Sequence, residues 1–326
     1  MPEANKIRVG IVGGAGYTAG ELIRILLYHP EVILKYIQSS SNSGQPFAAV
    51  HTDLLGDTDM VFKDVNYQDT DIVFLCSGHG KSIDYLNNTS IPDHTKIIDL
   101  SHDFRLKRAG NDFVYGLPEL NREQIRVATK IANPGCFATA IQLALIPLAS
   151  AGVLIDEVHI NAITGSTGAG QSPTKTSHFS WRDNNLSVYK AFEHQHLGEI
   201  YQSLCQTQPD FSKDVNFIPV RGNHTRGIFV TAYTKFDGSV EEANELFRKF
   251  YATHPFVNVA SENIDMKQVV NTNKGLLYLE KHGSKLMIIS CIDNLLKGAS
   301  GQAVQNMNLM YGIDERCGLN LKAIGF

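Results

Sequence analysis

The N-terminal part of the chain alternates short apolar runs with stretches whose apolar residues recur every three or four positions. Short apolar runs predict buried strands, and the three-to-four-residue period predicts helices packed on them. The predicted strands are 7–12, 32–37, 71–76, 96–100 and 127–132. The first helix follows a glycine-rich turn and stops before Pro30. Strands separated by helices at this spacing predict an α/β domain with a doubly wound, Rossmann-type parallel sheet.

The pattern changes after Ser150, where strand-like runs follow one another with few helices between them. They are 157–164, 215–220, 227–236, 266–271, 276–279 and 285–292. Strand runs without helices between them predict a mainly antiparallel sheet, so the second domain is expected to be α+β.

Helical periods interrupt this second part at 188–204 and 240–254, and a last helix is predicted at 301–310. The second of these helices opens on a capping box formed by Ser239 and Glu242. The last one is expected to return to the first domain. We therefore expect one domain of residues 1–135 plus 300–326 and another of residues 136–299.

The turn after the first strand reads Gly13-x-x-Gly16-x-x-Ala19 and opens a helix. A strand, a glycine-rich turn and a helix in this order are typical of a dinucleotide-binding fold. Gly13 would make the tight turn, and Gly16 would let the backbone approach a pyrophosphate at the helix N-terminus. The expected cofactor contacts here are Gly13, Gly16, Tyr17, Thr18 and Ala19. A glycine turn with only a packing role is the alternative.

The loop after the second strand holds a serine cluster, Ser39 to Ser43, and no Asp or Glu. An NAD site usually places an acidic residue here to bind the ribose 2′-hydroxyl, whereas hydroxyl groups tolerate a 2′-phosphate. NADP(H) is therefore the predicted cofactor, with contacts from Ser39, Ser40 and, after the third strand, Ser77. A bare surface loop would explain the serines equally simply.

The sequence Asn133-Pro134-Gly135-Cys136 predicts a sharp turn that leads into a helix over 137–148. Unpaired N–H groups and the positive end of the helix dipole favour a thiolate at such a place. Cys136 is therefore a candidate nucleophile. The alternative is that it is a small buried hydrophobic residue, as most free cysteines are.

Three further stretches carry candidate chemistry. Arg105 lies beyond the end of a predicted strand, where it could bind a phosphate or a carboxylate, or else form a surface salt bridge. The loop 164–170 is rich in backbone donors and is either an anion site or a plain turn. On a predicted helix, His194 and His196 would point about 200° apart, so they could not share a metal ion. No metal site is predicted, and His196 is expected to be solvated or paired with Glu199.

Composition narrows the class of protein. The 326 residues are 43% hydrophobic and 19% charged, with a net charge of −4 and no basic run, which argues against nucleic-acid binding. The cysteines are scattered and odd in number, as expected for reduced thiols in the cytoplasm. The longest apolar stretch, 138–155, contains too many polar residues for a membrane span. A strand that begins by Ile7 leaves no room for a signal peptide.

A cysteine nucleophile, a histidine and a nicotinamide site suggest acyl chemistry coupled to hydride transfer. The sequence resembles the N-acetyl-γ-glutamyl-phosphate reductase family of arginine biosynthesis over nearly the whole chain. The stretches that carry the resemblance are 16–22, 99–106, 115–120, 133–136, 165–170, 194–196, 226–228 and 293–298.

The resemblance implies an NADPH-dependent reduction of an N-acyl-γ-glutamyl phosphate to its semialdehyde through a thioester on Cys136. It implies His194 as the acid/base, whose imidazolium would stabilise the thiolate. It adds the expected cofactor contacts Gly168, Asn294, Lys297 and Gly298, and the substrate contacts Arg105, Asn133, Ser166 and Arg226. It also implies a homo-oligomer, dimer or tetramer, built by the second domain.

The chain departs from the family pattern at several positions. Ala19-Gly20 stands where the family usually has Gly-Ala, Ala138 stands where it has proline, and Gln195 stands where it often has arginine. Acetyl is the family default for the substrate's acyl group, and a larger or acidic group stays open. The competing activities are those of aspartate-semialdehyde dehydrogenase, glyceraldehyde-phosphate dehydrogenase and an N-acyl-aminoadipyl-phosphate reductase. A nucleotide sensor without catalysis is the alternative from another class.

Overall fold

The computed structural model describes residues 6–78 and 80–325, so both ends of the predicted first domain lie outside the described residues. The described chain folds into two compact units. The first contains the residues up to Leu117, Asn121–Pro134 and Ala299–Leu319, and the second contains Pro118–Leu120, Gly135–Gly298 and the residues from Asn320. Helix α3 (Pro118–Val127) is therefore divided between them.

The first unit is built on a six-stranded parallel sheet of order β2-β1-β3-β4-β6-β5. The strands are β1 (Ile7–Val12), β2 (Val32–Gln38), β3 (Ile72–Leu75), β4 (Lys96–Asp99), β5 (Val114–Tyr115) and β6 (Lys130–Ala132). The predicted Rossmann-type sheet is confirmed, and the short edge strand β5 is an addition to the prediction.

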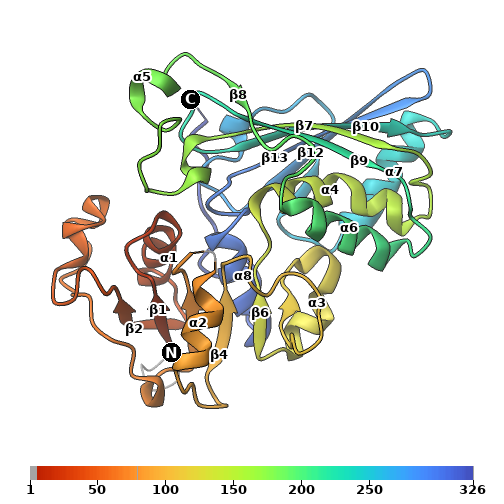
Figure 1. Ribbon diagram of the computed structural model, residues 1–326. Helices are drawn as coiled ribbons and strands as arrows, with labels where there is room; N and C mark the ends of the chain where they lie inside the picture. The colour runs from red at the N-terminus through yellow and green to blue at the C-terminus, as the bar shows by residue number, and fades with distance from the viewer. Residues whose placement is uncertain (1–5, 79, 326) are drawn as a thin grey trace. The chain divides into compact units, whose positions relative to one another are not determined.

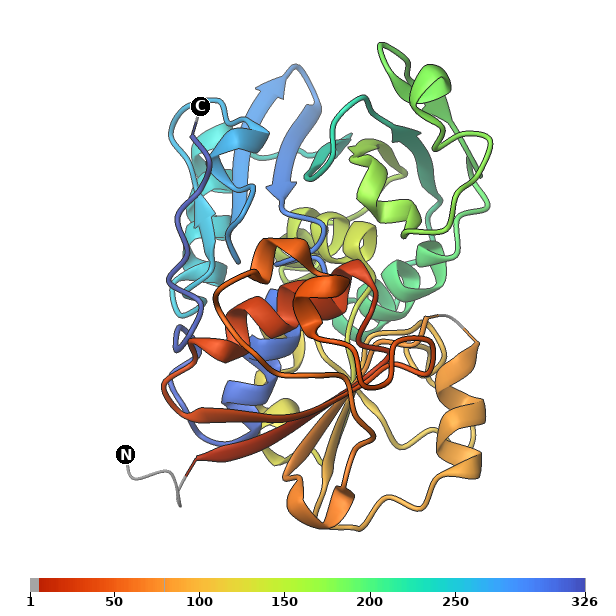
Figure 2. The same cartoon turned by 90° about the vertical axis from the view of Figure 1, so that its left-hand side faces the viewer.

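Helices cover this sheet because its strands are apolar on both faces. Val73 and Leu75 of β3 pack with Tyr85 and Leu86 of α2 (Lys81–Asn88). The alternate residues of the same strand are also buried and face the other side. Helices α1 (Tyr17–Leu27) and α8 (Ser300–Met310) lie against each other, the one red and the other blue in Figure 2. The C-terminal helix thus returns to the first unit, as predicted.

The second unit is built on a seven-stranded sheet of order β11-β12-β13-β10-β7-β9-β8. Only the pairs β11–β12 and β7–β9 are parallel, so the predicted mainly antiparallel sheet is confirmed. The strands are β7 (Val158–Thr164), β8 (Ser187–Val188), β9 (Val215–Arg221), β10 (Ile228–Lys235), β11 (Val257–Val259), β12 (Gly275–His282) and β13 (Lys285–Ile292).

One face of this sheet is covered by α4 (Cys136–Ser150), α6 (His196–Thr207) and α7 (Val240–Tyr251), as Figure 1 shows. Helix α4 is buried along almost its whole length, which explains its uniformly apolar sequence. Helix α7 begins at the capping box of Ser239 and Glu242, which is confirmed.

Two predicted elements are wrong. The helix expected over 188–204 begins only at His196, because Lys190 and Phe192 have positive φ angles of 46° and 62° that no α-helix accepts. The strand expected over 266–271 is a 3₁₀ helix, Met266–Gln268, whose first turn is capped by the side chain of Asp265. A short helix, α5 (Phe179–Arg182), was not predicted.

Candidate active site

The glycine-rich turn of the first unit lies where the ends of three neighbouring strands meet. Gly13 has φ of 80°, and a Cβ there would lie 2.5 Å from the backbone N of Ser77, at the end of β3. The backbone N–H groups of Gly13 and Gly14 both donate to the carbonyl of Gln38, the last residue of β2. The strand order reverses between β1 and β3, which is where open α/β sheets bind their ligands.

The space in front of helix α1 is open. A Cβ on Gly16, the residue that precedes the helix, would meet no atom within 4 Å, and the Tyr17 side chain is exposed. Unpaired N–H groups at a helix N-terminus with open space in front fit a pyrophosphate. The side chain of Ala19, another expected cofactor contact, is fully buried and packs the helix.

The two serines after β2 that were expected to contact the cofactor differ in exposure. Ser40 is exposed, whereas Ser39 is buried and its Oγ accepts a hydrogen bond of 2.9 Å from Asn42 Nδ2. The absence of a carboxylate in this loop and the open helix end fit a dinucleotide with a 2′-phosphate. The residues of the first unit therefore fit the predicted cofactor.

Arg105 and Asn133, which were predicted to contact the substrate, are both hydrogen-bonded to the backbone or to side chains of the first unit. Arg105 is buried, and its Nε and Nη2 donate to the carbonyls of Asn133 (2.8 Å) and Leu100 (3.0 Å). The side chain of Asn133 donates to Ala299 O and accepts from Asn306 Nδ2. Both side chains therefore hold the backbone together at the ends of the strands.

Cys136 is the first residue of α4 and is partly buried, as its turn-to-helix position predicted. The turn before it is held from two sides. The N–H of Gly135 donates to Glu199 Oε2 at 2.9 Å, and a Cβ on Gly135 would overlap Nε2 of His196. Only glycine fits at position 135, and this fixes the start of the helix that carries the thiol.

His194 and His196 are neighbours, which contradicts their expected placement on opposite faces of one helix. Their ring centroids are 4.6 Å apart, and both rings pack edge-on against Phe137. The N–H of His196 donates to Nδ1 of His194 at 3.3 Å. The expected pairing of His196 with Glu199 is present, with 3.9 Å between Nε2 and Oε1. Both imidazoles are buried.

The neighbouring charges that act on His194 are positive. Burial, followed by the charges of Lys190 and Arg221, lowers the pKa of His194 to about 4. His194 is therefore neutral at pH 7 in the free protein, in contrast to the imidazolium expected from the resemblance. Burial, with the charge of a Cys136 thiolate, raises the pKa of Tyr189 to about 12. The Arg221 guanidinium lies 4.7 Å from the centre of the Tyr189 ring.

Sequence reasoning missed Tyr189 and Arg221 as site residues. Arg221 is the last residue of strand β9. A charged residue at the end of a predicted strand was the sequence signal that could have identified it. Tyr189 follows the two-residue strand β8, in a segment that was predicted to be helical. The sequence therefore did not indicate which way its side chain points.

The turn 293–298 is held internally by its polar side chains. Asp293 is fully buried and lies 3.0 Å from Nη2 of Arg226. Asn294 accepts from the N–H of Gly227 and donates to Thr167 Oγ1. Lys297 is fully buried, with its Nζ 2.8 Å from Glu119 Oε1. Asn294 and Lys297, which were expected to contact the cofactor, are thus also bonded within the second unit.

Gly298 brings this turn against Cys136. A Cβ on Gly298 would lie 2.8 Å from Cβ of Cys136 and 2.6 Å from Asn294 O. Ser166 and Gly168, in the 3₁₀ helix Ser166–Ala169, are at least partly exposed, and the N–H of Ser166 donates to His224 O. The second unit therefore gathers a cysteine and two histidines at the start of α4, with the charge of Arg221 near His194.

Gly298→Ala is expected to lower kcat by roughly a hundredfold, because an added Cβ must displace Cys136 or the backbone at Asn294 by a large part of an ångström. The measurement is kcat together with the rate at which iodoacetamide alkylates Cys136. Gly275→Ala is the control, since its Cβ would approach only the flexible end of Leu143, at 2.9 Å. Equal kcat in the two variants would show that Gly298 does not position the thiol.

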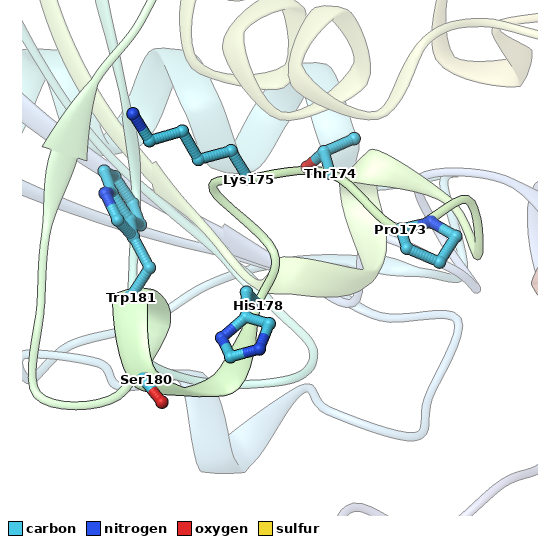
Figure 3. Close-up of a pocket in the computed structure, with 6 residues that line it drawn as sticks. All are labelled: Pro173, Thr174, Lys175, His178, Ser180 and Trp181. Carbon is cyan, nitrogen blue, oxygen red and sulfur yellow. The ribbon is translucent and has the colours of Figure 1, made fainter.

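A separate hollow of the second unit is lined by Pro173, Thr174, Lys175, His178, Ser180 and Trp181, shown in Figure 3. None of the predicted site residues lines it.

Among the described residues, no three His, Cys, Asp or Glu side chains are grouped so that they could hold a metal ion. No helix of the described chain has the length and apolar character needed to cross a membrane.

The two units match two family models. Residues 8–128 match the NAD binding domain of semialdehyde dehydrogenase, and residues 136–294 match its dimerisation domain. The chain belongs to the semialdehyde dehydrogenase family, and its first unit is a nicotinamide-dinucleotide-binding domain.

Similar proteins narrow this class further. The chain is 58% identical over 317 residues to a protein of Christiangramia forsetii, with 97% of this chain and 99% of that protein aligned. It is 57% identical over 324 residues to a protein of Flavobacterium johnsoniae, with 98% and 100% aligned. Both proteins are named N-acetyl-gamma-glutamyl-phosphate reductase. The resemblance inferred from the sequence motifs is confirmed.

Solved structures agree in fold. Aspartate semialdehyde dehydrogenase II of Vibrio cholerae, complexed with ASA, has a TM-score of 0.74 at 16% identity, with 94% of this chain and 98% of that chain covered. Aspartate semialdehyde dehydrogenase of Candida albicans, with NADP, has a TM-score of 0.72 at 14% identity, with the same coverage.

Proposed function

We propose that this protein is an NADPH-dependent reductase that converts an N-acyl-γ-glutamyl phosphate to the N-acyl-glutamate semialdehyde and phosphate in arginine biosynthesis. One observation carries the proposal: Cys136 begins a buried helix, beside Gly298 and a pair of buried histidines. The high identity to proteins of that name over nearly the full length supports the choice of substrate, with acetyl as the default acyl group.

Cys136 is the proposed nucleophile. Its thiolate attacks the γ-acyl carbon, a C–S bond forms, and the C–O bond to the phosphate breaks as phosphate leaves. The N-terminus of α4 favours the thiolate. When bound, NADPH supplies the hydride that reduces the thioester carbon to the level of an aldehyde.

His194 is the proposed acid/base. Its Nδ1 accepts from the N–H of His196, so the neutral ring carries its proton on Nε2, which can donate a hydrogen bond to oxygen. The ring gives a proton to oxygen only as the imidazolium, after it has taken up a second proton. Negative charge that develops on the substrate raises the pKa of a nearby histidine and helps it to take up a proton in the complex. The proton returns to His194 when the thiohemiacetal C–S bond breaks and releases the aldehyde.

Anion recognition is assigned to groups of the second unit. Arg226 is held by Asp293 and keeps a fifth of its side chain exposed, at 20%. Arg221 adds a second positive charge near His194, and Ser166 adds a hydroxyl. We propose that these residues bind the phosphate and carboxylate of the substrate, and that Gly168 and Gly298 approach the cofactor.

The reaction is tested in reverse by following phosphate-dependent reduction of NADP with different aldehydes. N-acetylglutamate semialdehyde is expected to be oxidised, with a kcat/KM at least roughly a hundredfold above that for aspartate semialdehyde. The reason is that a site whose polar groups pair with one substrate rejects a substrate that leaves those groups unpaired. Preference for aspartate semialdehyde would overturn the assignment of the substrate. NADPH binding with no turnover of either aldehyde would favour a sensor.

The proposed preference for NADPH rests on the acid-free loop after β2. Ser40→Asp places a carboxylate on an exposed position of this loop and is expected to raise the KM for NADPH at least roughly tenfold while that for NADH falls, because it repels the 2′-phosphate. Ser90→Asp, on another exposed loop of the same unit, is the control. Equal use of NADH and NADPH by the unmodified protein would contradict the interpretation of the loop.

Location and assembly are proposed on separate grounds. No disulfide joins Cys76, Cys136, Cys205, Cys291 or Cys317, all of which lie in the described part of the chain, and this supports a reducing compartment such as the cytoplasm. The second unit matches a dimerisation domain, which supports a homo-oligomer, a dimer or tetramer built by that unit. Light scattering on the purified protein measures the oligomer directly, and a monomer at micromolar concentration would contradict the proposal.

A further inference from the structure

Ala19-Gly20 stands where the family usually has Gly-Ala, and the side chain of His51 packs against the glycine of this pair, Gly20. The imidazole of His51 lies against helix α1 over Gly20, where a Cβ would come within 2.7 Å of its Nδ1 and 3.0 Å of its Cε1. The other nitrogen, Nε2, is 2.7 Å from the carbonyl oxygen of Gly14. The absence of a side chain at position 20 therefore lets a histidine from another segment reach the glycine-rich turn.

The loop that carries His51 is firmly placed. The N–H of His51 donates to Phe47 O at 2.8 Å, between the short helices Phe47–Ala49 and Thr52–Leu54. The imidazole also lies near the ring of Phe62, with 6.5 Å between centroids, and the side chains of Phe47 and Phe62 are fully buried. Only 7% of His51 is exposed, so its ring has little freedom to turn.

The contact with Gly14 fixes the direction of a peptide group. A carbonyl can only accept, so Nε2 of His51 carries the proton and donates it. The N–H of Gly14 is already bonded to Gln38 O at 2.8 Å, and a Cβ on Gly14 would overlap Ile37. Because the peptide is planar and trans, a Gly14 carbonyl that points toward His51 directs the N–H of Ala15 the opposite way.

We infer that His51 is a positioning residue for the cofactor, which holds the Gly14–Ala15 peptide in the orientation that binds the pyrophosphate. Its side chain acts through the backbone of the turn, and Gly20 is the space that admits it. The inference rests on the cofactor part of the proposed function and is independent of the acyl substrate.

The test measures the dissociation constant for NADPH by its fluorescence, with the purified full-length protein and no acyl substrate present. His51→Ala removes the donor to Gly14 O and is expected to weaken NADPH binding roughly three- to tenfold, the range of one hydrogen bond. His51→Gln can place an amide N–H near the same carbonyl and is expected to restore most of the affinity. The KM for the aldehyde in the presence of saturating NADP and phosphate is expected to stay unchanged in both variants.

His29 provides a matched control in the same unit. It is buried, its Nε2 lies 3.1 Å from Asn308 Oδ1, and a Cβ on Gly318 would overlap its ring. His29 thus packs against a glycine as His51 does, but its Nε2 bonds to Asn308 rather than to the glycine-rich turn. His29→Ala is expected to lower the melting temperature without changing NADPH affinity, whereas His51→Ala changes the affinity.

A double-mutant cycle then tests the fit between His51 and Gly20. Gly20→Ala is expected to push His51 away and weaken NADPH binding as much as His51→Ala does, with no further loss when the two changes are combined. Additive losses, or NADPH affinity in His51→Ala equal to that in His29→Ala, would overturn the inference. An unmodified protein that does not bind NADPH would instead contradict the proposed cofactor.

Discussion

Replacement of Cys136 by serine is expected to abolish turnover while NADPH binding stays nearly unchanged. A serine hydroxyl fits the same space, but it lacks the nucleophilicity of a thiolate at neutral pH. The change replaces one atom of a residue in the second unit, whereas the glycine-rich turn expected to bind the pyrophosphate is part of the first unit. The measurement is kcat in both directions together with the dissociation constant for NADPH.

Alkylation provides an independent measure of the same thiol. Iodoacetamide at neutral pH is expected to modify Cys136 ahead of Cys76 and Cys291, because burial raises the pKa of both of those thiols, that of Cys291 to about 12. Cys205 is exposed, so Cys205→Ser is the control for access, and it should retain full activity. If Cys76 or Cys291 is modified first and activity is kept, Cys136 is not the nucleophile.

The parts of the fold that depend on local chemistry could be predicted. The apolar helix after Cys136, the capping box at Ser239 and the parallel strands of the first unit all follow from periodicity and from residues close together in sequence. The start of α6 could not be predicted, because nothing in the sequence marks Lys190 or Phe192 as residues with positive φ. A helix extended backwards from residue 196 then placed the two histidines wrongly.

The sequence indicated which residue types belong to the candidate site, but it did not indicate their hydrogen-bond and ion-pair partners. Lys297 and Asn294 lie in a motif expected to contact cofactor, yet their charge and amide are bound by Glu119, Gly227 and Thr167. Glu119 is 178 positions away from Lys297 in sequence. Distant polar partners decide whether such a side chain is available to a ligand, and periodicity carries no information about them. A motif therefore locates the site without assigning the contacts.

The histidine pair gives the second large expected effect. His194→Asn removes the proposed acid/base and is expected to lower kcat by at least roughly a hundredfold, within the 10²–10⁴-fold typical of proton transfer. Because the pKa of His194 is about 4, the ring is neutral at pH 7 and adds no positive charge that would stabilise the thiolate of the free protein. Alkylation of Cys136 at pH 7 is therefore expected to stay within a fewfold of the unmodified rate.

His196→Asn is the matched variant, since its ring contacts the same Phe137 and lies beside Gly135 and Glu199. Its role is to position the cysteine turn, so it is expected to lower kcat less than His194→Asn and to change the alkylation rate more. Glu199→Gln keeps an oxygen that can accept from Gly135 N–H, so it should retain more activity than Glu199→Ala. A larger loss of kcat in His196→Asn than in His194→Asn would make His196 the acid/base, with Glu199 as its partner.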